Sequence, residues 1–185
     1  MLSESPAVRR DILAFLGALS LFLAAVEYLI PKPLPFLRLG LANLPLLIGL
    51  GFLKPRDLLI VLVLKVFGQG LVNGTLASYV FLFSLAGTTA SLGTMAAVHR
   101  LGGRHVSLIG VSLAGALASS LVQTALAVTF VFGETARLIA PLSVGSSVVT
   151  GLVMGSFAEA FRSRSRWLAA LERRYRSAAA PGGLS

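Results

Sequence analysis

Three polar side chains recur at four-residue steps inside an apolar stretch of the chain. Lys65, Gln69 and Asn73 are spaced i, i+4 and i+8, which places them on one face of a helix. An ionised lysine at the middle of a membrane-spanning helix costs about 2.5 to 3.5 kcal/mol, so it normally faces a cavity or a partner. This face therefore predicts either a site for a polar ligand or a set of contacts between helices.

A second polar face is predicted further along the chain. It is made by residues at three- and four-residue steps, namely Ser112, Gly115, Ser119 and Gln123. Asn43 and Ser84 lie in two other apolar runs, at depths that a rise of about 1.5 Å per helical residue places in the same half of a membrane. These polar groups are therefore expected to converge near the extracytoplasmic side.

Two charges complete the predicted site. Glu27 ends the first apolar run, and Arg38 lies in the loop that follows it. Two cations, one carboxylate and several amides would suit a small ligand with a carboxylate, phosphate or other anionic group. The alternative is that Lys65 snorkels or pairs with Glu27 while the amides join helices. The expected ligand-binding residues are Glu27, Arg38, Asn43, Lys65, Gln69, Asn73, Ser84, Ser119 and Gln123.

Catalysis finds little support in the composition. The only aspartates are Asp11 and Asp57, too few for an Asp-rich magnesium site. No GxxxxGK[ST] loop is present, and His99 and His105 share one loop, which argues against a transmembrane haem. Cysteine is absent. We expect no catalytic residue, no metal site and no cofactor, and hence not an enzyme.

Apolar runs dominate the chain and predict its architecture. Hydrophobic residues make up 56% of it and charged residues 12%, with a mean hydropathy of +0.87. This composition predicts an all-α integral membrane protein with six transmembrane helices in one domain over residues 12–161. The second run is of marginal length for a span and is interrupted by Pro45. The runs are Ile12–Ile30, Leu39–Leu53, Asp57–Val72, Thr75–Val98, Val106–Phe132 and Ala136–Phe161.

The distribution of basic residues predicts the orientation, since cytoplasmic loops retain Lys and Arg. Lys32, Arg38 and Arg137 fall on one side, Lys65 lies within a span, and the other twelve of the 16 basic residues fall on the opposite side. Both termini are therefore predicted to be cytoplasmic, as an N-terminal segment (1–11) and a basic tail (162–185), in a multi-pass protein of the cell inner membrane. Loops beside the lipid bilayer explain the net charge of +9 better than nucleic acid does. The twelve are Arg9, Arg10, Lys54, Arg56, Arg100, Arg104, Arg162, Arg164, Arg166, Arg173, Arg174 and Arg176.

Small residues at four-residue spacing allow helices to approach closely. Ala14 and Ala18 form such a pair in the first run, and Gly151 and Gly155 form another in the sixth. Packing within the chain explains most such pairs. The remainder would be docking faces for a partner membrane protein.

Several motifs resemble a known family. They are Glu27-Tyr28-Leu29-Ile30-Pro31, Arg38-Leu39-Gly40-Leu41-Ala42-Asn43, Gly74-Thr75, Ser84-Leu85-Ala86-Gly87 and Ile109-Gly110-Val111-Ser112-Leu113-Ala114-Gly115-Ala116. They resemble the Gx transporter family, also labelled heptaprenyl diphosphate synthase component I, which is similar to the S components of energy-coupling factor transporters. The resemblance implies a six-helix S-component-like bundle with its ligand site in the outer half. It also implies docking through Ala14 and Ala18 on a transmembrane coupling subunit whose ATPases are separate partners.

Three functions remain open at this point. The leading hypothesis is a substrate-binding membrane subunit of a small-molecule importer. The second is a non-catalytic membrane partner in isoprenoid or quinone metabolism, or in flavin-linked electron transfer at the outer surface. The third is a scaffold whose polar faces only join helices.

Overall fold

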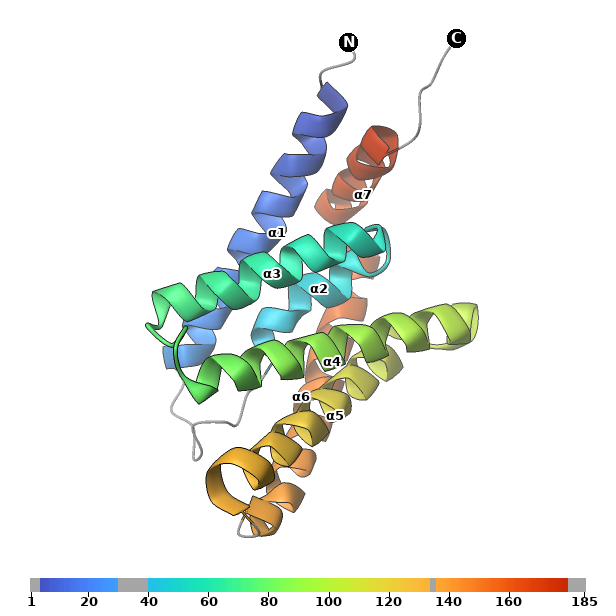
Figure 1. Ribbon diagram of the computed structural model, residues 1–185. Helices are drawn as coiled ribbons and strands as arrows, with labels where there is room; N and C mark the ends of the chain where they lie inside the picture. The colour runs from blue at the N-terminus through green and yellow to red at the C-terminus, as the bar shows by residue number, and fades with distance from the viewer. Residues whose placement is uncertain (1–3, 30–39, 134–135, 180–185) are drawn as a thin grey trace.

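The computed structural model describes residues 4–29, 40–133 and 136–179, and these fold almost entirely into helices (Figure 1). A 3-10 turn precedes α2, another follows α4, and a π-helical turn over Val128–Phe132 extends α5. The α-helices are α1 (Glu4–Leu29), α2 (Leu44–Gly49), α3 (Pro55–Val72), α4 (Tyr79–Gly102), α5 (Leu108–Ala127), α6 (Ala136–Arg164) and α7 (Arg166–Ala179).

Among the described residues, four helices are long and apolar enough to cross a membrane. They include the segments Ala7–Leu29, Tyr79–Gly102, Leu108–Val131 and Ala140–Arg164. Helix α3 has 18 residues, a length of about 27 Å, but it carries Arg56, Asp57 and Lys65. The all-helical class and several spans thus agree with the sequence, while the count of six and the orientation stay predictions.

Helix α2 differs most from its predicted span. The run Leu39–Leu53 contains an α-helix of only six residues, which begins with Pro45 in its first turn and ends at Gly49. Six residues cover about 9 Å, far less than the roughly 30 Å of a hydrocarbon core. The apolar character of the run comes instead from burial, because every residue of α2 is buried within the protein.

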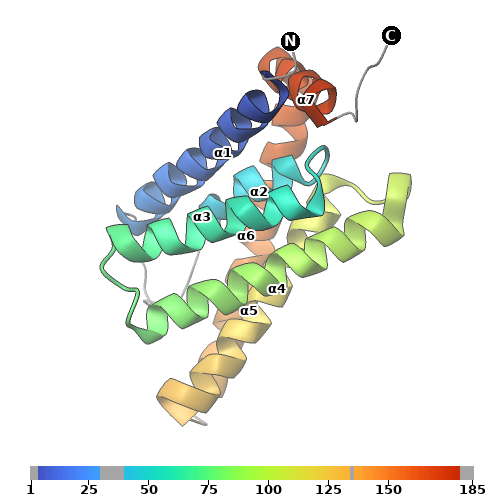
Figure 2. The same ribbon diagram turned by 45° about the horizontal axis from the view of Figure 1, so that its top comes forward.

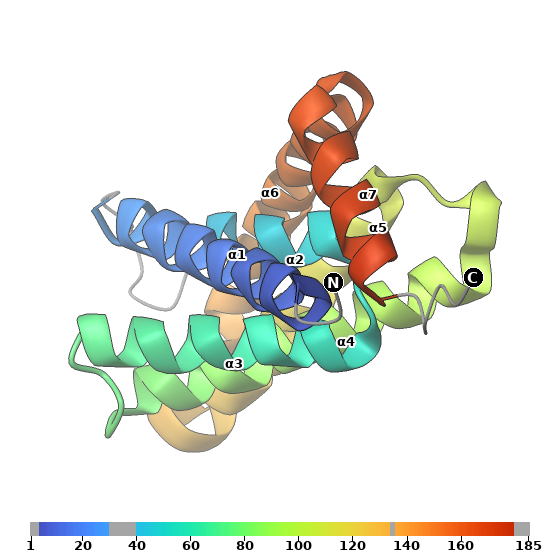
Figure 3. The ribbon, with the colours of Figure 1, turned by 90° about the horizontal axis from the view of Figure 1, so that it is seen from above.

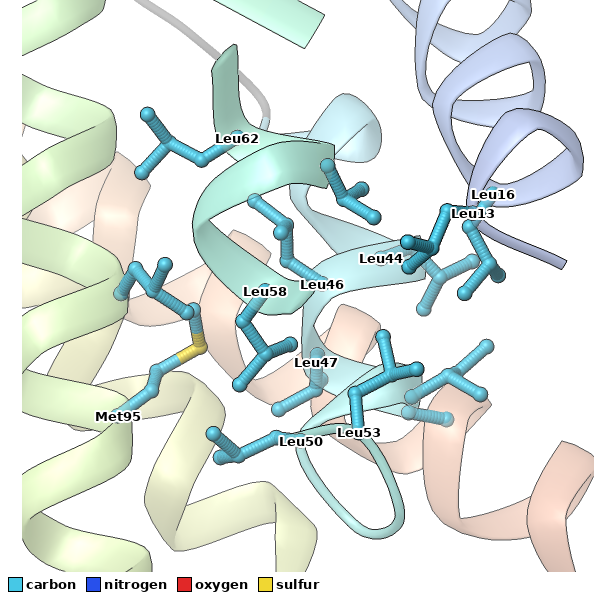
Figure 4. Packing of buried hydrophobic residues seen from close by; sticks show 14 of the residues in the cluster. Leu13, Leu16, Leu44, Leu46, Leu47, Leu50, Leu53, Leu58, Leu62 and Met95 are labelled. Atoms are coloured by element: carbon cyan, nitrogen blue, oxygen red, sulfur yellow. The ribbon is translucent and has the colours of Figure 1, made fainter. Parts of the chain in front are cut away.

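The hydrophobic core forms around α2. Leu46 and Leu47 from α2 are 0% and 2% exposed, and they lie among leucines of α1 and α3 and Met95 of α4 (Figure 4). Figure 2 shows α1 and α3 side by side with α4 running below α3. A short, fully apolar element at this place lets the longer helices surround it.

Helices α5 and α6 form the most extensive helix pair, and glycines bring them together. A Cβ atom added at Gly155 would lie 2.5 Å from the Cα atom of Ile109, and one at Gly151 would lie 3.0 Å from the Cα atom of Leu113. Close backbone approach of this kind is what small residues permit in membrane helices. The predicted Gly151–Gly155 pair therefore packs within the chain.

The tail helix α7 packs against the N-terminal half of α1, where the two lie near each other in Figure 3. Its apolar side is covered by the protein: Leu168 and Tyr175 are 3% and 1% exposed, and the rings of Trp167 and Phe15 lie 5.1 Å apart. Residues 162–185 were predicted as a basic cytoplasmic tail. In the structure, α7 of this segment belongs to the bundle.

A buried polar cluster joins α7 to α1 and α3. The Asp57 carboxylate is fully buried and accepts hydrogen bonds from the guanidinium of Arg9 and the hydroxyl of Tyr175. The same hydroxyl accepts a hydrogen bond of 3.1 Å from the backbone N–H of Lys54. Because the carboxylate would be costly to bury alone, this cluster holds the beginnings of α1 and α3 and the end of α7 together.

Candidate ligand site

A cavity lies between α3, α4, α5 and α6, with α1, α2 and the turn before α2 closing the remaining sides. Its empty volume is about 820 Å³, including the part open to solvent. Most of the side chains that line it are polar, although the helices themselves are apolar. Polar side chains in membrane helices normally face the bundle interior or a cavity such as this one, which makes it the candidate site.

Lys65 is the buried cation of this cavity. Its side chain projects from the middle of α3 and is 3% exposed. The ammonium group donates hydrogen bonds to Asn43 Oδ1, at the start of α2, and to Thr88 Oγ1, in α4, the latter at 3.1 Å. Lysine therefore connects three segments that are distant in sequence, and part of its burial cost is offset by these two acceptors.

Gln69 and Glu27 line the cavity together with Lys65. Gln69 is one turn further along α3, and Glu27, which is 5% exposed, comes from the end of α1. The Gln69 Oε1 atom is buried without a hydrogen-bond partner among the described residues. Leaving a buried acceptor unpaired costs about 1–3 kcal/mol. We therefore expect a hydrogen-bond donor for this atom inside the cavity.

The wall formed by α5 and α6 is rich in hydroxyl groups. Gln123 Nε2 donates to Ser119 Oγ at 3.1 Å, and the hydroxyls of Ser120 and Ser143 pair at 2.9 Å between α5 and α6. Hydroxyls of α6 also bond to backbone carbonyls of their own helix. Such groups can donate or accept, so this wall accommodates polar groups of either kind.

Glycines bring α4 and α5 close together along the cavity. A Cβ atom at Gly87 would lie 2.8 Å from Ser119 Oγ, and one at Gly115 would lie 2.9 Å from Ser91 Oγ. Gly40 also lines the cavity, and its φ of 77° belongs to the left-handed region that side chains rarely adopt. Glycine at these positions determines how near α4 approaches α5 and where the turn before α2 begins.

Most of the expected site residues meet in this cavity. Six of the nine expected residues line it, namely Glu27, Asn43, Lys65, Gln69, Ser119 and Gln123. Asn73 lies at the end of α3, and Ser84 is buried in α4, but neither is a lining residue. Arg38 lies outside the described residues. Whether the lining residues bind a ligand stays a prediction.

Sequence reasoning missed part of the wall, although a periodic signal was present. Thr88 and Ser91 follow Ser84 at four- and three-residue steps along α4, and Thr150 follows Ser147 by three residues along α6. Of these, all but Ser84 line the cavity. The search for polar faces that found those of α3 and α5 would have identified these residues too.

The predicted docking pair lies on the outside of the bundle. Ala14 and Ala18 are both exposed on α1, whereas the neighbouring Leu13 and Leu16 are 6% and 2% exposed and face the core. Two pairs of small residues with the same spacing thus have different surroundings. Gly151 and Gly155 pack against α5, while Ala14 and Ala18 are exposed on the surface of the bundle.

Apolar helices around a polar cavity define a helical membrane protein of the multi-pass type. A family model described as heptaprenyl diphosphate synthase component I matches residues 16–161. The chain belongs to this family, as the sequence motifs indicated. No curated protein and no solved structure matches the chain.

Proposed function

We propose that the chain is a substrate-binding membrane subunit of a small-molecule importer, similar in role to an S component. The ligand binds in the cavity between α3, α4, α5 and α6, on the extracytoplasmic side. The chain itself performs no chemical step. The site residues are Lys65, Gln69 and Asn43 on one side and Gln123 and Ser119 on the other.

The burial of Lys65 beside a cavity is the observation that carries this proposal. If the only role of this side chain were to join helices, a neutral residue could do so at a lower free-energy cost, because an ionised lysine in the membrane interior is expensive. The cavity gives the ammonium group access to a polar ligand. The amides and hydroxyls around it then fix the position of that ligand.

Energy for transport comes from separate proteins in this proposal. The exposed Ala14–Ala18 face of α1 provides the surface on which a transmembrane coupling subunit docks, and its ATPases drive the cycle. The apolar residues around this face lie in a helix long enough to span a membrane. The inner membrane is the corresponding location.

Ligand binding by the purified chain tests the proposal. The full chain in lipid nanodiscs is screened against vitamins and small anionic metabolites, with the unfolding midpoint as the readout, because a bound ligand stabilises the folded state. At least one compound is expected to raise the midpoint. Lys65→Met is expected to abolish that rise.

A matched pair of serines provides the control. Ser119 lines the cavity, whereas Ser163 is exposed near the end of α6. Ser119→Ala should weaken binding, and Ser163→Ala should leave it unchanged. A screen without any binder, or a Lys65→Met variant that binds as well as the wild type, would contradict the importer role; the latter result would favour a scaffold.

The family description favours a second candidate function. The matched family is described as a component of heptaprenyl diphosphate synthase, so the chain is alternatively a non-catalytic membrane partner of a prenyl diphosphate synthase. Cross-linking in native membranes separates the two functions. Capture of a soluble prenyl synthase would support this candidate, and capture of a coupling subunit would support the importer.

A further inference from the structure

Lys65 and Gln69 present opposite hydrogen-bonding requirements to the cavity. The lysine ammonium has donors and no acceptor, whereas the Gln69 carbonyl oxygen only accepts. The two side chains are four residues apart on α3, so their Cβ atoms lie about 5–6 Å from each other. A ligand that touches both must therefore carry an acceptor and a donor at a similar separation.

Because the Gln69 Oε1 atom is unpaired, the ligand must supply a hydrogen-bond donor to it. Native proteins leave few buried polar atoms unpaired, and among the described residues only Ser20 Oγ shares this condition with it. Ser20 is not a lining residue, whereas Gln69 is. A purely anionic ligand would place acceptor oxygens against the Gln69 carbonyl oxygen, where they would repel each other.

The formal charges along the cavity agree with this requirement. Lys65 and Glu27 are the charged side chains among the described lining residues, and their charges are opposite. A ligand without net charge suits such a lining better than a dianion does. The hydroxyl wall of α5 and α6 serves donors and acceptors equally and does not alter the choice.

We propose that the cavity binds a small zwitterionic ligand, with its carboxylate toward Lys65 and an N–H donor toward Gln69 Oε1. This inference rests on the proposed ligand site and specifies the class of its substrate. It differs from the anionic ligand expected from the sequence in requiring the N–H group.

Four small probes test the class on the full chain in nanodiscs by calorimetry. They are 4-aminobutanoate, with both groups; butanoate, with the carboxylate alone; butylamine, with the amine alone; and pyrophosphate, with acceptors alone. We expect 4-aminobutanoate to bind at least tenfold more tightly than each of the others. Equal affinity for butanoate or pyrophosphate, or no binding by any of the four, would overturn the inference.

Two substitutions at Gln69 test which atom of the amide is used. Gln69→Glu keeps an acceptor and removes the amide donor, so it should bind 4-aminobutanoate no more than about threefold more weakly than the wild type. Gln69→Leu should lower it at least tenfold. Equal losses in the two variants would mean that Gln69 donates, which contradicts the inference. If Gln69→Glu does not fold, the probe comparison on the wild-type chain decides.

The wider metabolite screen separates this inference from the proposed function. If compounds without an N–H donor bind as well as those with one, the chain is still a binding subunit and only the zwitterion is wrong. If no compound of the screen or of the probe set binds, both are wrong.

Discussion

Lys65 and Asp57 lie eight residues apart on α3, and the protein stabilises them in different ways. Asp57 is fully buried and accepts hydrogen bonds from Arg9 and Tyr175. Lys65 has Asn43 and Thr88 as partners and also borders a cavity. One buried charge thus serves to hold helices together, and the other borders the cavity of the proposed ligand site.

Tyr175→Phe tests the structural cluster. The substitution removes the donor to Asp57 and the acceptor for the Lys54 N–H, so we expect a loss of about 1–3 kcal/mol, measured as a lower unfolding midpoint. Tyr79→Phe is the matched control, because Tyr79 is 55% exposed. Its midpoint should not change. An unchanged midpoint in Tyr175→Phe would show that α7 is held by its apolar contacts alone.

The pH dependence of this contact follows from the pKa of Tyr175. Burial raises that pKa, and the hydrogen bond to Asp57 raises it further. A group whose pKa is higher in the folded protein stabilises the fold below its unfolded value of about 10 and loses this effect as the pH rises through the folded value. The difference in midpoint between Tyr175→Phe and the wild type should therefore persist at neutral pH and shrink only in strong alkali.

Helices of similar composition have different surroundings in this bundle. In α6, Gly151 and Gly155 face the backbone of α5, whereas a Cβ atom at Gly145 would have nothing within 4 Å. In α1, Leu13 and Leu16 face the core while Ala14 and Ala18 face outward. The same spacing of small residues therefore has an internal role in one helix and an external surface in the other.

Gly155→Ala tests the internal role. Its added methyl group would meet the Ile109 backbone at 2.5 Å, and overpacking of this kind costs about 1–3 kcal/mol. We expect a lower unfolding midpoint. Gly145→Ala is the control and should be neutral or stabilising by up to about 1 kcal/mol, because alanine has the higher helix propensity. Equal midpoints for the two variants would mean that α5 and α6 adjust freely.

Leucines at Ala14 and Ala18 test the external surface. The double variant should keep the unfolding midpoint, because both positions are exposed, and should lose association with a transmembrane coupling subunit in native membranes. Ala97→Leu, at an exposed position of α4, should retain the association. Copurification measures both results, and a double variant that still copurifies with the subunit would contradict the docking proposal.

The molecule as a whole has polar groups inside and apolar groups outside. Leu121 and Val153 are 59% and 53% exposed, while Gln123 and Ser147 are each 7% exposed. Such a distribution fits lipid as the surrounding solvent. Arg9, Asp57 and Tyr175 are in contact, so these parts of α1, α3 and α7 lie on one side of the membrane. With α1 spanning the membrane as predicted, we expect the chain to return to that side between the end of α1 and the start of α3, despite the short α2.

Single cysteines test this path, since the chain has no cysteine of its own. Ala77→Cys, in the turn between α3 and α4, should react with an impermeant maleimide on intact cells. Arg56→Cys and Ser177→Cys should react only after permeabilisation. All three positions are exposed in the structure. Labelling of Arg56→Cys on intact cells would contradict the six-span topology and favour four spans.

Local periodicity was enough to predict much of this protein. Long apolar runs predicted α1, α4, α5 and α6, because a helix in lipid needs only its own sequence to satisfy its backbone. Residues three and four apart share a helix face whatever the fold. That geometry predicted that Lys65 and Gln69 share one face of α3 and that Ser119 and Gln123 share one face of α5.

Contacts between distant segments could not be predicted in this way. The burial of α2, the hydrogen bond from Lys65 to Thr88 and the contact of Tyr175 with Asp57 each join residues that are remote in sequence. They depend on how helices cross, which side-chain volumes along both partners determine together. For the same reason, spacing could not distinguish the outward Ala14–Ala18 pair from the inward Gly151–Gly155 pair, since only the packed bundle specifies what each face meets.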